Sequence, residues 1–114
     1  MIVDWDEKIV QLFRDFADED LQRRSWFGIG PEVSSPTEMC CSVEDLDVEG
    51  WRTFKEPLVG ERLSDMIKDF VSEVDLLPED VNDWRVFASS EWIKIRLMAS
   101  VIRDLLEKRM DETT

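Results

Sequence analysis

The sequence predicts an all-α protein, a compact bundle of about four to six helices. Apolar residues recur at three- and four-residue steps in several segments, and residues that start or stop helices flank these segments. Only residues 84–87 alternate weakly between polar and apolar, and one strand alone cannot form a sheet. The 114 residues are within the usual size of one domain, so we expect a single helical domain over residues 1–114.

The first helix is predicted over about residues 4–20. Its apolar residues fall on one helical face, and they are Trp5, Ile9, Leu12, Phe13 and Phe16. Asp4, Asp6 and Glu7 lie in its first turn, where the helix dipole favours negative charge. These features predict a helix whose apolar side faces the core.

Turn-forming residues then interrupt the helical pattern. Gly28, Gly30 and Pro31, followed by Ser34 and Ser35, predict an irregular loop around residues 22–35. No regular element is expected in this segment.

The run Ser35-Pro36-Thr37-Glu38 is typical of a helix start, with serine at the N-cap, proline at N1 and glutamate at N3. The helix that it begins is predicted to run to about residue 48 and to end at Gly50. Pro57 and Gly60 then predict a second irregular loop around residues 50–60.

The clearest helical stripe of the chain follows this loop. Its members are Leu63, Met66, Ile67, Phe70, Val71 and Val74. The run Leu77-Pro78-Glu79-Asp80 breaks the pattern and predicts a short turn of helix that reaches Trp84.

The last helix is predicted over about residues 91–110, with Ser90 as its cap. The residues expected to face inward are Trp92, Leu97, Met98, Val101, Ile102, Leu105 and Leu106. This helix should supply the largest single share of the core.

Negative charge is concentrated in the middle of the chain. The formal net charge is −13, and residues 38–83 alone hold 14 acidic and 4 basic residues. On a helix, Glu61, Asp65, Asp69 and Glu73 would form one solvent-facing ridge at four-residue spacing. A second acidic cluster, Asp45, Asp47, Glu49 and Glu56, surrounds Trp51 and Phe54. These groups either keep the protein soluble or bind a basic surface, to which Trp51 and Trp26 could add anchors if they are not core residues.

The sequence offers little catalytic chemistry. It contains no histidine and no tyrosine, and it carries no nucleophile-elbow or phosphate-loop motif. Residues 45–56 match the ligand spacing of an EF-hand loop, but Arg52 at position 8 and Pro57 after the final glutamate argue against calcium. We therefore expect no enzyme activity, no metal and no cofactor. The charge disfavours nucleic acid as a partner.

A cytoplasmic location is expected, because the chain begins with an acidic segment and contains no long apolar stretch. The adjacent Cys40 and Cys41 are interpreted as small buried apolar groups in a reducing compartment.

In size, acidity and lack of catalytic residues the chain resembles bacterial toxin-immunity proteins, including those of contact-dependent growth inhibition. The local resemblance is carried by Ser25-Trp26-Phe27-Gly28-Ile29-Gly30-Pro31-Glu32-Val33-Ser34-Ser35-Pro36, which leads into an acidic helix. Immunity proteins share no single fold, so the resemblance implies a role and not an architecture. That role is the capture of a basic toxin domain, often a nuclease.

The partner-binding residues predicted from this interpretation are Asp45, Asp47, Glu49, Trp51, Glu61, Asp65, Asp69 and Glu73. The alternative is a non-catalytic regulatory or adaptor subunit that binds a larger cytosolic enzyme through an apolar face. The sequence leaves the identity of the partner, the stoichiometry and the oligomeric state open.

Overall fold

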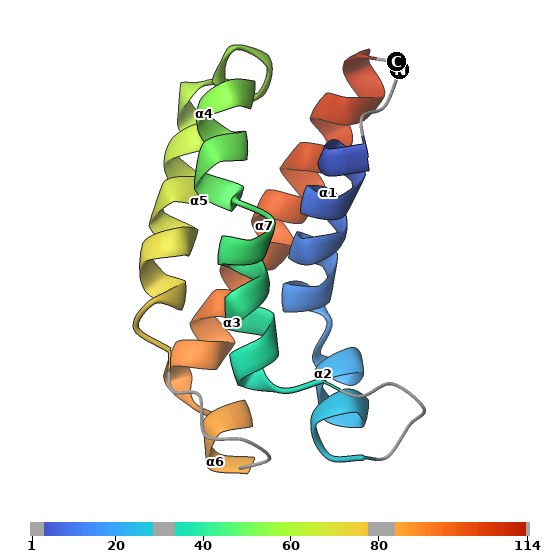
Figure 1. Cartoon of the computed structure of the whole chain (residues 1–114), viewed down its shortest axis with the longest axis vertical. Helices are drawn as coiled ribbons and strands as arrows, with labels where there is room; N and C mark the ends of the chain where they lie inside the picture. Colours follow the sequence, from blue (N-terminus) through green and yellow to red (C-terminus); the bar gives the residue numbers. More distant parts are fainter. Residues whose placement is uncertain (1–3, 29–33, 78–83, 114) are drawn as a thin grey trace.

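The computed structural model describes residues 4–28, 34–77 and 84–113, and every regular element among them is a helix (Figure 1). The helices are α1 (Asp4–Ala17), α2 (Glu19–Trp26), α3 (Pro36–Asp45), α4 (Val48–Val59), α5 (Glu61–Val74), α6 (Trp84–Phe87) and α7 (Ser90–Thr113). The all-α prediction is confirmed. The described residues form more helices than predicted because α2 and α4 occupy segments that the sequence predicts as loops.

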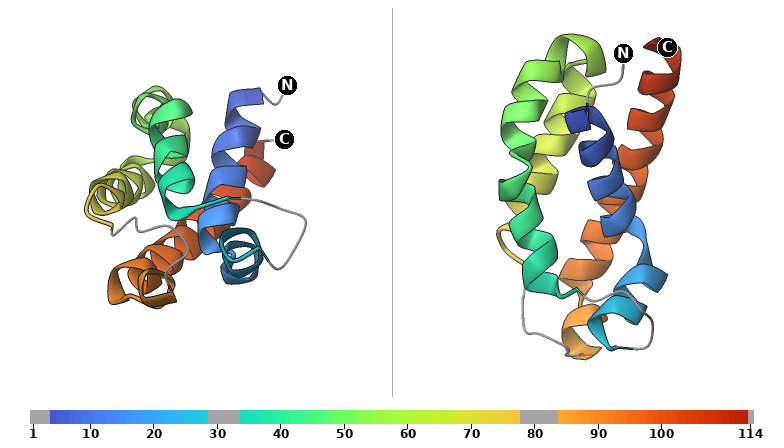
Figure 2. Two further views of the ribbon diagram at one scale, coloured as in Figure 1. Left: turned by 60° about the horizontal axis from the view of Figure 1, so that its bottom comes forward. Right: turned by 45° about the vertical axis from the view of Figure 1, so that its right-hand side comes forward.

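Two antiparallel helix pairs form the body of the molecule. α1 runs along α7, α4 runs along α5, and α5 also packs against α7 (Figures 1 and 2). Aromatic rings join the pairs at the centre, where the ring centroid of Phe16 lies 5.2 Å from that of Phe70 and 6.0 Å from that of Trp92. The apolar faces predicted for α1 and α5 are therefore the faces that build the core.

The predicted first helix is divided at Asp18. The Asp18 side chain accepts a hydrogen bond from the backbone N–H of Leu21 at 3.0 Å and so begins a new helix, α2. The buried Gln22 amide donates to the carbonyl oxygens of Asp15 and Phe16, both at 3.0 Å, which satisfies acceptors at the end of α1. The loop predicted around 22–35 is therefore wrong for residues 22–26, and residues 29–33 lie outside the described residues.

The start of α3 is as predicted. Ser35 Oγ accepts from the backbone N–H of Glu38 at 3.1 Å, and Pro36 occupies the first turn. The helix ends at Asp45, a few residues earlier than expected. Cys40 is buried as predicted, whereas Cys41 is exposed, so the interpretation of both cysteines as buried groups is wrong for Cys41.

Removing the Ser35 cap should have a measurable cost. We expect Ser35→Ala to lower the free energy of unfolding by about 1 kcal/mol, because the Glu38 N–H loses its acceptor. Ser35→Asp, which retains an acceptor at the N-cap, is the matched control and should stay near wild type. Urea unfolding followed by circular dichroism measures both, and equal stability of the two variants would contradict the role of the cap.

The loop predicted around 50–60 is wrong, because residues 48–59 form α4. Val48, Trp51 and Val59 lie on one buried face of this helix, and tertiary packing of such a face outweighs weak helix propensity. A Cβ at position 50 would lie 2.2 Å from Asp47 Oδ2, so any residue other than glycine would force the capping carboxylate to move. Pro57 falls in the last turn, where only one ladder hydrogen bond is lost.

The helix predicted after this segment is confirmed as α5. Leu63, Ile67, Phe70 and Val74 are buried, and Met66 and Val71 pack against the core at its edge. The predicted break at 77–80 lies mostly outside the described residues, which resume at Trp84. The weakly alternating residues 84–87 form a single helical turn, α6.

The last helix is longer than predicted, and its inward face is partly different. Trp92, Ile102 and Leu106 are buried as expected. Leu97, Val101 and Leu105 are instead exposed, and the prediction that they face inward is wrong. The other buried residues of α7 are Ile95, Arg96 and Ala99.

A second apolar stripe of α7 therefore faces solvent. We call Ile93, Leu97, Val101 and Leu105 the α7 stripe; its members are 37% to 65% exposed. They follow one another at four-residue steps along the helix. Contiguous exposed apolar residues of this kind can form a contact surface.

Arg96 is the one basic residue on the inner face of α7. Its guanidinium donates to Gln22 Oε1 at 2.7 Å and to the carbonyl oxygen of Phe87 at 2.6 Å, and it lies 4.2 Å from the centroid of the Phe87 ring. Burial lowers the pKa of Arg96 from its ordinary value. These contacts join α2 and α6 to α7.

Candidate acidic partner-binding surface

The junction of α3 and α4 holds three of the predicted partner-binding acids. Asp45 ends α3, Asp47 caps α4, and Glu49 lies in the first turn of α4. Asp47 has a left-handed backbone (φ 51°), and its carboxylate accepts from the Gly50 N–H at 3.1 Å. Asp45, Asp47 and Glu49 lie close together in the sequence, and all three residues are exposed.

The ridge predicted on α5 is present for three of its four residues. Glu61, Asp65 and Asp69 are exposed along the outer side of the helix. Glu73 is half-buried, and its carboxylate lies 3.0 Å from Lys94 Nζ of α7. Its negative charge is therefore paired within the protein, and the prediction that Glu73 forms part of an open ridge is wrong.

Arg52 lies between α4 and α5 and offsets part of the negative charge. Its guanidinium donates to Glu49 and, at 2.9 Å, to Ser64 Oγ. The hydrogen bond from Arg52 holds the pKa of Glu49 below its ordinary value. The pKa of Arg52 is raised, first by the bond to Glu49 and further by Glu56 and Asp65. Arg52 thus acts on three carboxylates, and Lys68 also acts on Glu49, so two cations offset part of the negative charge at this point.

Both predicted tryptophan anchors are core residues. Trp51 is 0% exposed, and its indole N–H donates to Asp6 Oδ1 at 2.9 Å. Trp26 is also buried, and its ring packs at 4.9 Å from the Trp92 centroid. Neither side chain can insert into a partner while the protein stays folded, so the prediction of Trp51 as an anchor is wrong.

The exposed aromatic residue of this region is Phe54, which the sequence does not single out as an anchor. Its side chain is 68% exposed. The ring stacks beside Trp5, with centroids 6.3 Å apart and planes inclined by 20°, and Lys55 Nζ lies 5.4 Å from its centroid. Trp5 is itself fixed, because its indole N–H donates to the carbonyl oxygen of Leu46 at 2.7 Å.

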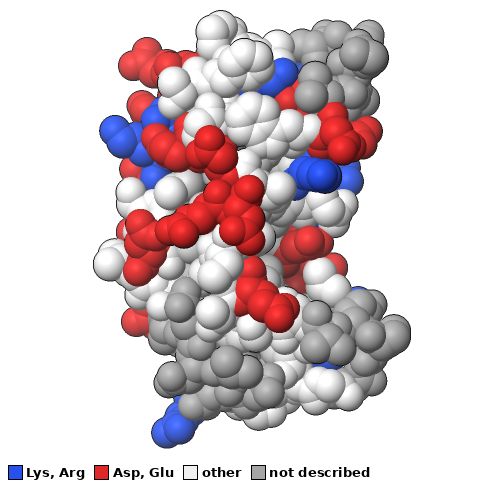
Figure 3. All heavy atoms as spheres, in the orientation of Figure 1, with Lys and Arg blue, Asp and Glu red and all other residues white. Residues whose placement is uncertain are grey.

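We call the exposed carboxylates of α3, α4 and α5 the acidic surface. Its members are Glu38, Glu44, Asp45, Asp47, Glu49, Glu56, Glu61, Asp65 and Asp69. Figure 3 shows Asp and Glu atoms in a band across the middle of the face on which α3 and α4 lie, with Lys and Arg atoms at its margins. Carboxylates therefore gather on the face on which α3 and α4 lie.

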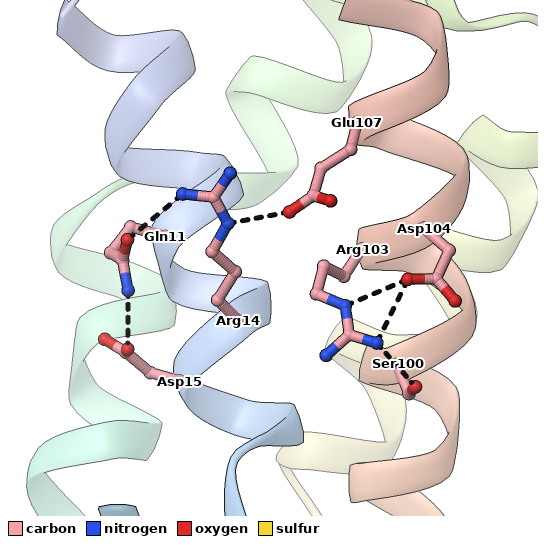
Figure 4. Close-up of polar contacts among 7 residues, drawn as sticks. All are labelled: Gln11, Arg14, Asp15, Ser100, Arg103, Asp104 and Glu107. Carbon is pink, nitrogen blue, oxygen red and sulfur yellow. Dashed lines mark hydrogen bonds and ion pairs between the residues drawn. The ribbon is translucent and has the colours of Figure 1, made fainter.

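The contact between α1 and α7 is different, because its charges are paired. Arg14 Nε lies 2.7 Å from Glu107 Oε1 across the two helices, and Arg103 binds Asp104 at 3.0 Å on α7 (Figure 4). These pairs are solvent-accessible and contribute little to stability. The four charges of these two pairs offset one another.

No group of three or more potential metal ligands is found within the described residues, and the EF-hand-like spacing from Asp45 to Glu56 falls largely within helix α4. Among the described helices, none has both the length and the apolar character needed to cross a membrane.

Comparison of the chain with protein-family models, with curated proteins and with solved structures finds no match in any of the three.

Proposed function

We propose that this protein is an inhibitor that captures a basic protein partner through the acidic surface. The observation that carries the proposal is the band of Asp and Glu atoms across the face on which α3 and α4 lie (Figure 3), together with the exposed carboxylates of α5 and the exposed ring of Phe54 on α4. Acidic surfaces speed encounter with cationic partners, and aromatic residues commonly provide the contacts that hold such complexes together.

The position of two of these acidic residues supports a role in binding a partner rather than in stabilising the fold. Glu44 and Asp45 occupy the last turn of α3, which contains no basic residue. The helix dipole disfavours negative charge at that end by about 0.3–1 kcal/mol per group at low ionic strength. Their presence there gives no benefit to the helix, whereas a cationic partner would be attracted to them.

The partner best suited to this surface is a toxin domain with a cationic cleft, such as a ribonuclease or deoxyribonuclease. The substrate of such a domain is a chain of phosphates, and cationic side chains hold it. Carboxylates spaced along the acidic surface would occupy the same side chains and exclude the substrate. The protein would then act in a one-to-one complex as the immunity protein of that toxin.

Charge reversal on the acidic surface should slow association with the partner. We expect Asp45→Lys/Asp69→Lys to lower the association rate constant about tenfold or more at low salt, since electrostatic steering raises such rates by about 10–1,000-fold. The partner is first captured from the source cells on immobilised wild-type protein and then purified. Stopped-flow fluorescence gives the rate constant at ionic strengths of about 0.01 M and about 1 M, between which the Debye length falls from about 30 Å to about 3 Å.

The matched control is Glu91→Lys/Asp104→Lys, which makes the same change in net charge on exposed positions of α7. This variant should associate at nearly the wild-type rate. A wild-type rate constant that does not change with ionic strength, or an equal loss in both variants, would contradict the proposal. Inhibition is tested separately: wild-type protein should abolish the partner's nuclease activity, and cells that make the partner should grow only when the wild-type protein is also made.

The α7 stripe supports a second candidate function. A regulatory or adaptor subunit would bind a larger enzyme through an apolar face, and Ile93, Leu97, Val101 and Leu105 provide such a face opposite the buried side of α7. Leu97→Ser distinguishes the two functions, because Leu97 is the most exposed member. Loss of partner binding in Leu97→Ser, with normal binding by Asp45→Lys/Asp69→Lys, would favour the adaptor.

A further inference from the structure

A cavity of about 250 Å³ lies between α1 and α3. Leu12, Phe16 and Met39 provide apolar walls, and Asp15, Glu38 and Ser42 contribute polar groups. The two carboxylates come from different helices, Asp15 from α1 and Glu38 from α3. Figure 3 shows acidic side chains on this part of the face, which continues from the acidic surface.

Asp15 is the less solvated of the two carboxylates. Its Oδ1 accepts a hydrogen bond from Gln11 Nε2 at 2.8 Å (Figure 4). Burial raises the pKa of Asp15 from its ordinary value and the charge of Asp18 adds to the rise, although Gln11 and Arg14 act in the opposite direction. The ionised carboxylate is therefore under-compensated in the free protein, and a cation beside it would remove that deficit.

The size and lining of the cavity define the class of ligand. Its volume equals that of about eight water molecules at roughly 30 Å³ each, which is more than a monatomic ion needs. It is smaller than the roughly 300–1,000 Å³ typical of cofactor and drug sites. A long side chain with an apolar stem and a cationic end is intermediate in size between an ion and a cofactor. It also suits the lining, because the stem can lie along Leu12 and Met39 while the cationic end reaches the carboxylates.

We infer that this cavity receives an arginine side chain of the basic partner, held between Asp15 and Glu38. A guanidinium presents five donors in one plane and pairs with carboxylates through two parallel hydrogen bonds, whereas an ammonium is a compact, strongly hydrated charge. Ser42 donates its hydroxyl hydrogen to the Met39 carbonyl at 2.5 Å and keeps its oxygen available as a further acceptor. The inference deepens the proposed function and rests on it.

The test uses N-acetyl-arginine amide as the probe, titrated into the full-length protein and followed by amide chemical shifts. Saturable shifts are expected at Leu12, Asp15, Glu38 and Met39, with a dissociation constant on the order of 1 mM for one isolated side chain. N-acetyl-citrulline amide has the same shape without the charge and should produce no such shifts. Asp15→Asn/Glu38→Gln should weaken binding of the arginine probe about tenfold or more.

The control for the variant is Glu7→Gln/Glu44→Gln, which removes one exposed carboxylate from each of the same two helices outside the cavity. This control should bind the arginine probe as wild type does. Equal weakening in both variants, or shifts spread over the whole acidic face, would show general attraction and overturn the inference. Because no partner is needed, failure here leaves capture by the acidic surface untouched. If the association rate constant with the partner did not change with salt, while the arginine probe still bound in the cavity, the proposed function alone would be overturned.

Discussion

Asp6→Ala should lower the free energy of unfolding by about 3–5 kcal/mol, the cost of breaking a buried ion pair by removing one partner. Asp6 is 8% exposed and accepts from the Trp51 indole N–H at 2.9 Å and from Lys55 Nζ at 3.0 Å. Without the carboxylate, a nearly buried ammonium and a buried indole N–H both lose their acceptor. Urea unfolding followed by circular dichroism measures the loss.

Asp4→Ala is the matched control in the same turn of α1. Asp4 is exposed and lies 3.6 Å from Lys8 in a solvent-accessible pair, which should contribute at most about 0.5 kcal/mol. The double variant Asp6→Leu/Lys55→Met should be more stable than Asp6→Ala, since no unpaired charge stays buried. If Asp6→Ala and Asp4→Ala were equally stable, the network around Trp51 would not hold α1 and α4 together.

The parts of the fold that the sequence predicts well are those in which local pattern and packing agree. α1 and α5 each have one apolar face and one polar face, so a single orientation buries the apolar residues. The start of α3 is predicted for a similar reason, because Ser35 and Pro36 satisfy the requirements of a helix N-terminus within four residues. No distant contact is needed to decide any of these features.

α4 could not be predicted in this way, because its stability depends on distant residues. Gly50 and Pro57 are locally unfavourable in a helix, and Gly60 ends it. The helix forms because Trp51 packs in the core and bonds to Asp6, 45 residues earlier in the chain. In the folded helix Trp51 is buried in the core and Phe54, three residues on, is 68% exposed, so the exposed aromatic residue is Phe54.

Only part of the candidate site could be predicted, because some of its features depend on contacts between helices. Charge counts along the sequence identify the acidic residues of α3, α4 and α5. In the folded protein most of these residues are exposed. The pair between Glu73 and Lys94 joins two helices that are distant in sequence, and only their packing reveals it. The cavity between α1 and α3 likewise depends on how two helices pack, which residue spacing within one segment does not encode.

The buried face of α7 is the hardest feature to predict from the sequence, because the helix carries two apolar stripes. Trp92, Ile95, Ala99, Ile102 and Leu106 alternate three- and four-residue steps and form the buried face. The α7 stripe uses four-residue steps only, and its direction turns about 40° around the helix at each step, given about 3.6 residues per turn. The buried Arg96 also interrupts the apolar residues of the inner face. The inner face is therefore hard to recognise from the sequence.

Adjacent substitutions on α7 should therefore have opposite outcomes. Ile102 is 1% exposed and Val101 is 49% exposed. We expect Ile102→Asp to lower the free energy of unfolding by about 5 kcal/mol or more, because it removes buried apolar surface and places a carboxylate without a partner in the core. That loss equals much of the roughly 5–15 kcal/mol available to a domain, so little folded protein should remain at 37 °C.

Val101→Asp introduces the same side chain one residue away and should change stability by no more than about 0.5 kcal/mol, because the carboxylate stays in water. Thermal and urea unfolding of the two purified variants, with amide hydrogen exchange of α7, give the comparison. A large loss in Val101→Asp at low protein concentration would mean that the α7 stripe is packed in the core. If the loss appeared only at high concentration, where copies of the chain could associate, the stripe would instead be buried between molecules.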